Sequence, residues 1–245
     1  MPVRVVPTLA PMAEVYRLPS EGGPSSPRFN TYLSLIRSGM PLSGFNPMTN
    51  KDVLGTIEEL LAFDAERVLQ DAADDLAIVD DVDVFITVAT PGVWTDRLAT
   101  EIDHRLVGRS WPQVLWWTGS PVNRATFLQQ AQGQLVRAGW TSRYGPPETL
   151  ADAAGQEGLA LSFADEGALH ADVASALDVL GHDRSLATMV AVLYGDDAAQ
   201  AMGFSPVGLG PGAGLRHCAA VAQTARRGRD LRGLLAARWS PVLSR

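Results

Sequence analysis

Two apolar segments of this 245-residue chain are each followed by polar residues that could bind an anion. The segment "VFITVAT" leads into Pro91-Gly92, and the segment "QVLWWT" leads into Gly119-Ser120. If both segments are parallel strands, the residues that follow them meet at the edge of the sheet where ligands of such sheets bind. The predicted ligand-binding residues at this edge are Thr90, Gly92, Trp94, Thr95, Arg97, Ser120 and Arg124.

Arg97 and Arg124 fall in the first turns of two predicted helices. A cation at that end opposes the helix dipole, and an anionic ligand between the two helix ends would reverse the penalty. The unpaired N–H groups of the same helix ends, at Thr95 and Ser120, would also favour an anion. The alternative is an ordinary surface role, because the chain contains nineteen arginines and only one lysine.

The helix predicted after Thr95 carries the candidate catalytic residues Asp96, Glu101 and His104. Asp96 is the best placed for acid or base chemistry because it is nearest to the predicted strand end. A helical wheel turns His104 away from that edge, which counts against it. The alternative is a solvated helix on which Arg97, Glu101 and Arg105, spaced four apart, form a ladder of ion pairs.

Glu101 and His104 also have the i, i+3 spacing of one half of a di-metal carboxylate site. The sequence contains no second Glu-x-x-His to complete such a site, and a first-row metal needs three or more protein ligands. We therefore predict no metal site. No motif in the sequence identifies a cofactor.

The loop "GLGPGAGLR" (208–216) alternates glycine with other residues before a predicted helix. Backbone N–H groups of such a loop can cradle a phosphate or carboxylate, so Gly212 and Arg216 are further candidate ligand-binding residues. The loop matches neither the dinucleotide-binding pattern nor the Walker pattern. A mobile lid or a plain tight connection is an equal alternative.

Hydrophobic periodicity between Val82 and Ala138 predicts strand, helix, strand and helix, an order that requires a parallel pair of strands. A long helix is predicted from Thr49 or Asn50 to Leu76. Short strands are predicted at 3–6, 14–18, 159–163 and 188–195. We expect an α/β fold with a mostly parallel central sheet and helices on both faces. The predicted organisation is a single domain, 1–245, with an irregular N-terminal segment, 1–48, and a basic helical C-terminal segment, 216–245.

The composition, with 46% apolar and 19% charged residues, is that of an ordinary globular protein. No apolar run approaches the roughly 20 residues that span a bilayer, and prolines interrupt any signal-peptide core in "MPVRVVPTLAPM". We therefore expect a cytoplasmic protein that does not bind membranes. The single Cys218 excludes an intrachain disulfide.

The net charge of −7 is distributed unevenly along the chain. Seven arginines and one aspartate give residues 216–245 a charge of +6, which leaves −13 elsewhere, and ten acids lie within Glu58–Asp83. An acidic main body argues against nucleic acid as a partner. The basic tail is expected to dock on the acidic stretch of its own chain or of a neighbouring subunit in a homo-oligomer.

Two functional hypotheses follow. The first is a cytoplasmic α/β protein that binds an anionic small metabolite at the carboxyl ends of its strands, with acid/base catalysis, as in a hydrolase or transferase, left open. The second is a non-catalytic interaction or self-assembly protein that uses the acidic helix and the basic tail.

Overall fold

A computed structural model describes residues 3–40, 42, 45–49, 52–77, 82–92, 96–107, 112–164 and 167–242. The chain divides into two compact units. The first unit consists of Met1–Thr100 and Ser110–Ala131, and the second of Glu101–Arg109 and Gln132–Arg245. That the chain folds as a single domain stays a prediction.

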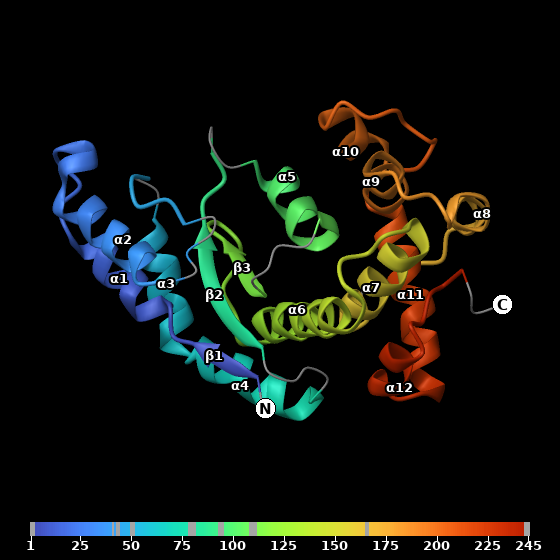
Figure 1. Cartoon of the computed structure of the whole chain (residues 1–245), viewed down its shortest axis with the longest axis horizontal. Helices are drawn as coiled ribbons and strands as arrows, with labels where there is room; N and C mark the ends of the chain where they lie inside the picture. The colour runs from blue at the N-terminus through green and yellow to red at the C-terminus, as the bar shows by residue number, and fades with distance from the viewer. Residues whose placement is uncertain are drawn as a thin grey trace. The chain divides into compact units, whose positions relative to one another are not determined.

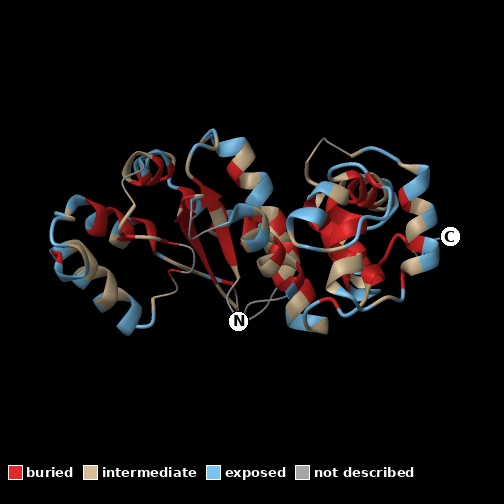
Figure 2. Cartoon of the chain, turned by 90° about the horizontal axis from the view of Figure 1, so that it is seen from above, coloured by how far each residue is buried: buried red, intermediate tan, exposed pale blue. Residues whose placement is uncertain are grey.

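The first unit contains a three-stranded parallel sheet. The strands are β1 (Arg4–Val6), β2 (Asp83–Ala89) and β3 (Gln113–Trp117), in the order β1-β2-β3 (Figure 1). Six of the seven residues of β2 are buried, as Figure 2 shows for the strands at the centre of this unit. A run of β-branched and aromatic residues is typical of a strand buried on both faces. The parallel register of β2 and β3, together with the helices described below, confirms the predicted α/β class and the predicted parallel pair.

Helices precede and follow the strands of the first unit. Before β2 these are α1 (Leu9–Arg17), the short 3-10 helix η1 (Gly23–Ser25), α2 (Pro27–Arg37), α3 (Val53–Ala62) and α4 (Ala65–Leu76). After β2 come α5 (Arg97–Ile102) and, beyond β3, α6 (Arg124–Tyr144), each of which continues into the second unit.

The segment 1–48, which we expected to be irregular apart from two short strands, contains β1, which confirms the strand predicted at 3–6, and the helices α1 and α2. The strand predicted at 14–18 is wrong, because these residues belong mostly to α1. Leu9, Met12, Ala13 and Tyr16 have three- and four-residue spacing and are all buried. That spacing is helical, and Pro11 near the start of the helix is tolerated there.

The long helix predicted up to Leu76 is two helices, α3 and α4. Asp64 separates them in a left-handed conformation, with φ of 54°, and its carboxylate accepts a hydrogen bond from the amide of Arg67. Aspartate is a favoured N-cap. A cap inside the predicted long helix therefore marks where α4 begins.

The described residues of the second unit form helices joined by loops, with no strand among them. The unit contains a π-helical segment, η2 (Asp103–Val107), the second half of α6, and the helices α7 (Leu150–Leu161), α8 (Ala171–Leu180), α9 (Leu186–Tyr194), α10 (Asp196–Ala201), α11 (Ala213–Gly228) and α12 (Leu231–Ala236). The strands predicted at 159–163 and 188–195 are wrong. A short apolar run buried all round looks the same in a core strand and a core helix.

Glycines allow the helices of this unit to pack closely. A Cβ on Gly158 of α7 would lie 2.8 Å from the carbonyl oxygen of Cys218 in α11. A Cβ on Gly214 of α11 would lie 2.1 Å from the carbonyl oxygen of Val192 in α9. These backbones approach each other only because no side chain intervenes.

Among the described residues, no helix is both long and apolar enough to cross a membrane.

Candidate functional site

The carboxyl ends of β2 and β3 lie side by side. The amide of Thr118 donates to the carbonyl of Ala89 over 2.9 Å, and the Thr118 hydroxyl lies 3.4 Å from the Thr90 hydroxyl. Thr90 is buried and Thr118 is half-buried. The two strands therefore deliver their following loops to one edge of the sheet, which is the arrangement that the predicted ligand site required. We call this region, Thr90–Gly92 with Thr118–Arg124, the sheet edge.

The loop after β3 turns sharply at Gly119. Its φ of 84° lies in the left-handed region that favours glycine, and the amide of Ser120 donates to the carbonyl of Trp117 over 3.1 Å. The helix expected to start at Ser120-Pro121 begins instead at Arg124. The side chain of Asn123 accepts from the amide of Thr126 over 2.9 Å and is the N-cap.

Exposure differs among the predicted ligand-binding residues of the sheet edge. Ser120 is half-buried, whereas Arg124 is exposed as the first residue of the 21-residue helix α6. Gly92 is exposed in the loop after β2. Trp94 and Thr95 lie outside the described residues.

The side chain of Asp96 caps α5. Its carboxylate accepts a hydrogen bond from the amide of Ala99 over 2.7 Å. The guanidinium carbon of Arg97 lies 5.6 Å from the centre of the Trp117 ring, at the end of β3. This cation–π contact holds Arg97 beside the last residue of β3. Of the acid/base candidates, Asp96 belongs to the first unit, whereas Glu101 and His104 belong to the second.

Glu101 and Arg105 form the i, i+4 ion pair predicted from their spacing, with 3.3 Å between Oε2 and Nη2. His104 is half-buried in the π-helical segment η2. Within the part of the chain that the structure describes, no group of three or more His, Cys, Asp or Glu side chains could hold a metal ion.

The glycine-rich loop before α11 binds a carboxylate of its own chain. The amides of Val207 and Gly208 donate to the side chain of Asp196 over 2.8 and 3.0 Å. The amide of Gly212 donates to the carbonyl of Tyr194 over 2.7 Å. The side chain of Arg216 is exposed. The N–H groups of 207, 208 and 212 are thus engaged within the protein, as in a tight structural connection.

The sequence pattern did not indicate the buried pair of Arg137 and Glu157 in the second unit. With Glu101 and Arg105 this pair forms what we call the Glu157 cluster. The carboxylate of Glu157 is fully buried and accepts two hydrogen bonds from Arg137, at 2.7 and 2.8 Å. Nη1 of Arg105 lies 3.9 Å from the same carboxylate. The available signal was Gln156-Glu157 in the middle of "LADAAGQEGLAL", an otherwise small and apolar helix.

The arginines determine the charge of Glu157. Burial alone would raise the pKa of this carboxyl, but Arg137 and Arg105 lower it, and the net shift of the pKa is downward. Burial raises the pKa of Tyr194 to about 12 and that of Cys218 to about 12. Glu157 is therefore ionised inside the protein, whereas Tyr194 and Cys218 are neutral.

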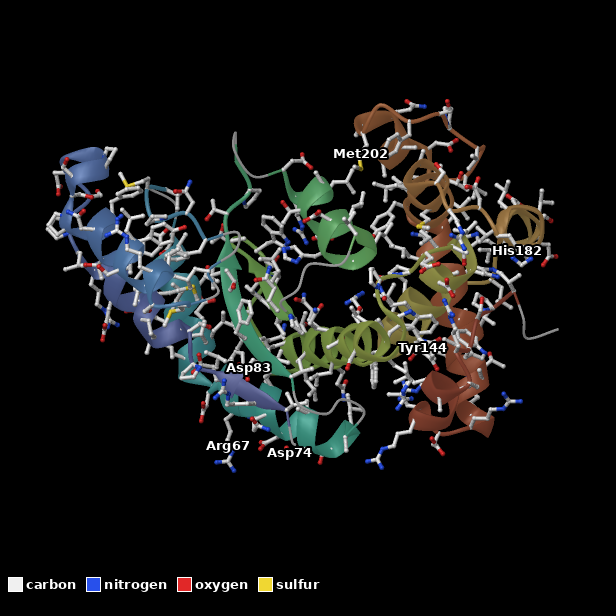
Figure 3. The ribbon with its side chains drawn as sticks, viewed as in Figure 1. Arg67, Asp74, Asp83, Tyr144, His182 and Met202 are labelled. Carbon is white, nitrogen blue, oxygen red and sulfur yellow. The ribbon has the colours of Figure 1, made fainter. Side chains whose placement is uncertain are left out.

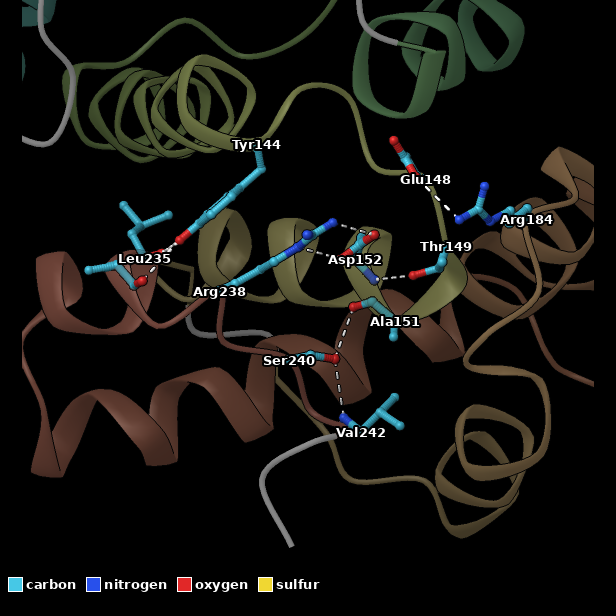
Figure 4. Close-up of polar contacts among 11 residues, drawn as sticks. Tyr144, Glu148, Thr149, Ala151, Asp152, Arg184, Leu235, Arg238, Ser240 and Val242 are labelled. Atoms are coloured by element: carbon cyan, nitrogen blue, oxygen red, sulfur yellow. Dashed lines mark hydrogen bonds and ion pairs between the residues drawn. The ribbon is translucent and has the colours of Figure 1, made fainter.

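The basic C-terminal segment docks on its own unit (Figure 4). Arg238 makes two 3.0 Å hydrogen bonds with Asp152 of α7, and the Tyr144 hydroxyl donates to the carbonyl of Leu235 over 2.6 Å. Arg226 donates to the Ser162 hydroxyl over 2.8 Å. These contacts tie the segment to α6 and α7, whereas we had expected it to reach the acidic stretch of 58–83 or a neighbouring subunit.

Comparisons with known proteins were made at three levels. No family model matches the chain, no curated protein matches it, and no solved structure matches it.

Proposed function

We propose that the protein binds a small anionic metabolite at the sheet edge. The observation that carries the proposal is the parallel pairing of β2 and β3, which brings the Thr90 and Thr118 hydroxyls within 3.4 Å of each other. Ligands of open parallel sheets bind outside the carboxyl ends of the strands. Arg97, held against Trp117 in the same unit, supplies a positive charge near the end of β3.

In this proposal Arg97 and Arg124 neutralise the anion, and the Thr90 hydroxyl, which accepts from Thr118, donates a hydrogen bond to it. The first turn of α6 adds the positive end of a helix dipole. Asp96 is the acid/base candidate for any reaction, because it belongs to the same unit as the sheet edge. Gly212 and Arg216 are left out, because the amide of Gly212 already donates to Tyr194.

The proposal includes helices on both faces of the sheet. Neighbouring residues of a strand point to opposite faces. Trp116 packs on Phe127 of α6, with 5.7 Å between ring centroids, whereas Trp117 lies under Arg97 of α5. These two contacts support covering helices on either side, and they would leave the carboxyl ends of the strands as the accessible edge.

The test is ligand-induced stabilisation. Inorganic phosphate and small carboxylates such as citrate should raise the Tm of the wild-type protein. Arg97→Ala should abolish the rise, since a hydrogen bond to a charged group contributes about 1.5–3 kcal/mol, or roughly tenfold or more in affinity. Thr118→Val should weaken binding less.

The matched control is Arg67→Ala, because Arg67 is an exposed arginine that points away from α4 in the same unit (Figure 3). This variant should retain the full response. If no anion stabilises the wild-type protein, or if both arginine variants respond alike, the proposal is wrong.

A second candidate function is self-assembly through charged surfaces. The outer face of α4 carries the exposed acids Asp64, Asp71, Asp74 and Asp75, and the C-terminal segment carries the exposed Arg227 and Arg229. Sedimentation at low and high salt tests it, because association through exposed charges is screened by salt. A monomer at low salt would contradict this second candidate.

A further inference from the structure

Two buried polar atoms at the Glu157 cluster have no hydrogen-bond partner among the described residues. They are Oε1 of Gln156 and the hydroxyl of Tyr194. Gln156 is 1% exposed and Tyr194 is 7% exposed. Buried polar atoms are nearly always hydrogen-bonded, so each such exception needs a cause, such as an ordered water or a ligand.

Both atoms belong to the surroundings of the same charges. The Tyr194 hydroxyl lies beside the guanidinium of Arg105, and the charges of Glu157 and Arg137 also act on it. The amide nitrogen of Gln156 donates to the carbonyl of Arg105 over 2.7 Å and lies 3.5 Å from Glu157. The unpaired oxygen of Gln156 is thus the remaining acceptor of a side chain that is already anchored in the cluster.

Arg105 contacts Glu157 less directly than Arg137 does. Arg137 occupies both oxygens of Glu157, whereas the nearest contact of Arg105 to that carboxylate, at 3.9 Å, is too long for a hydrogen bond. Its contact with Glu101 measures 3.3 Å, and the two side chains are 25% and 22% exposed. Arg105 and Glu101 are therefore the members of the cluster that reach solvent.

The local backbone is also unusual. Arg105 lies in the π-helical segment η2, and its carbonyl accepts from the Gln156 side chain. π-helical turns are rare and occur frequently at functional sites.

Charge balance restricts the chemistry of a ligand at this position. The cluster contains two arginines and two glutamates, so its formal charge is zero. A simple anion would meet repulsion from two carboxylates, and a simple cation would meet repulsion from two guanidiniums. A zwitterion keeps the formal charge of the cluster at zero. It can also exchange partners with the half-buried pair of Glu101 and Arg105.

We propose that Arg105, Tyr194, Gln156 and Glu101 form a binding site for a small zwitterion, an α-amino acid. The ligand carboxylate accepts hydrogen bonds from Arg105 and the Tyr194 hydroxyl. The ligand ammonium group donates to Oε1 of Gln156 and pairs with Glu101. Entry occurs by displacement of the solvent-facing ion pair, while Arg137 continues to neutralise Glu157.

The test is a titration of the ¹⁵N-labelled full chain with glycine, followed by two-dimensional NMR. Acetate and methylammonium, which each carry one half of the zwitterion, are titrated in parallel. Glycine should shift the amide signals of Gln156, Glu157 and Tyr194 at concentrations where neither fragment does. Tyr194→Phe should weaken glycine binding roughly tenfold, the typical effect of a hydrogen bond to a charged group.

Two control variants distinguish this site from general effects. Tyr194→Phe removes a hydroxyl that makes no geometric hydrogen bond and has the guanidinium of Arg105 as its polar neighbour, so the Tm of the free protein should change little. Tyr144→Phe removes a hydroxyl that is bonded to Leu235 in the same unit, so it should lower the Tm and leave glycine binding unchanged. Arg97→Ala should also leave glycine binding unchanged, which makes failure here distinguishable from failure at the sheet edge.

Three results would overturn the proposal. They are the absence of any glycine-dependent shift, binding of acetate as tight as that of glycine, and unchanged glycine affinity in Tyr194→Phe.

Discussion

Arginines have opposite environments at the sheet edge and in the Glu157 cluster. In the cluster, Arg137 is mostly buried, with its guanidinium on a fully buried carboxylate. At the sheet edge, Arg124 is exposed at the start of a helix, and Arg97 lies over an indole ring. In a chain with nineteen arginines, residue type therefore does not separate structural from ligand-binding residues. Burial and the identity of the partner separate the two kinds of arginine.

The largest effect on stability is expected when the buried ion pair of the Glu157 cluster is removed. Glu157→Ala leaves Arg137 buried without its partner, so the free energy of unfolding should fall by about 3–5 kcal/mol. Chemical denaturation measures it. The control is Glu148→Ala, whose pair with Arg184 is 62% and 75% exposed and should change stability by less than about 1 kcal/mol. Equal effects of the two variants would contradict the contrast between buried and exposed charges.

A smaller effect is expected where helices of the second unit pack closely. Gly214→Ala places a Cβ 2.1 Å from the Val192 carbonyl, so it should destabilise the protein by about 1–3 kcal/mol. Gly228→Ala, at the other end of α11, meets nothing within 4 Å and should leave stability unchanged or raise it by up to about 1 kcal/mol. Thermal unfolding of both variants checks the prediction, which fails if Gly214→Ala is as stable as the wild type.

Alkaline pH should lower the free energy of unfolding through the buried thiol of Cys218. Burial raises the pKa of Cys218 from 9.0 to about 12, so the folded state favours the neutral thiol. The stability that this preference contributes is complete below pH 9 and is lost as the pH rises toward 12. Cys218→Ala should therefore flatten the fall of unfolding free energy above pH 9, as measured by urea titrations. An identical pH profile in the variant would contradict it.

The smallest effect on stability is expected for the arginines of the sheet edge. Arg97→Ala and Arg124→Ala should each change the unfolding free energy by no more than about 0.5 kcal/mol, as surface substitutions usually do. Their effect should be seen in anion binding instead. Loss of several kcal/mol in either variant would assign that arginine to the fold rather than to the proposed site.

The order of strand, helix and strand from β2 to β3 could be predicted from the sequence, because β2 is a long β-branched run and turn residues follow both strands. The local pattern failed elsewhere. It failed at 159–163 and 188–195, where apolar residues are buried on all sides of a helix and periodicity carries no information. It also missed Glu157. A single acid in an apolar helix shows no partner, since Arg137 is 20 residues away in sequence and Arg105 is more distant still.

By itself, the sequence determined that two strands deliver polar loops toward a common edge, because alternation, β-branching and turn chemistry are local properties. Only the tertiary structure decided that Asp64 separates two helices and that the glycine-rich loop holds Asp196. It also decided that Arg137 and Glu157 join the pair of Glu101 and Arg105 in one cluster. These outcomes depend on which groups are desolvated together, and desolvation is a property of the packed chain.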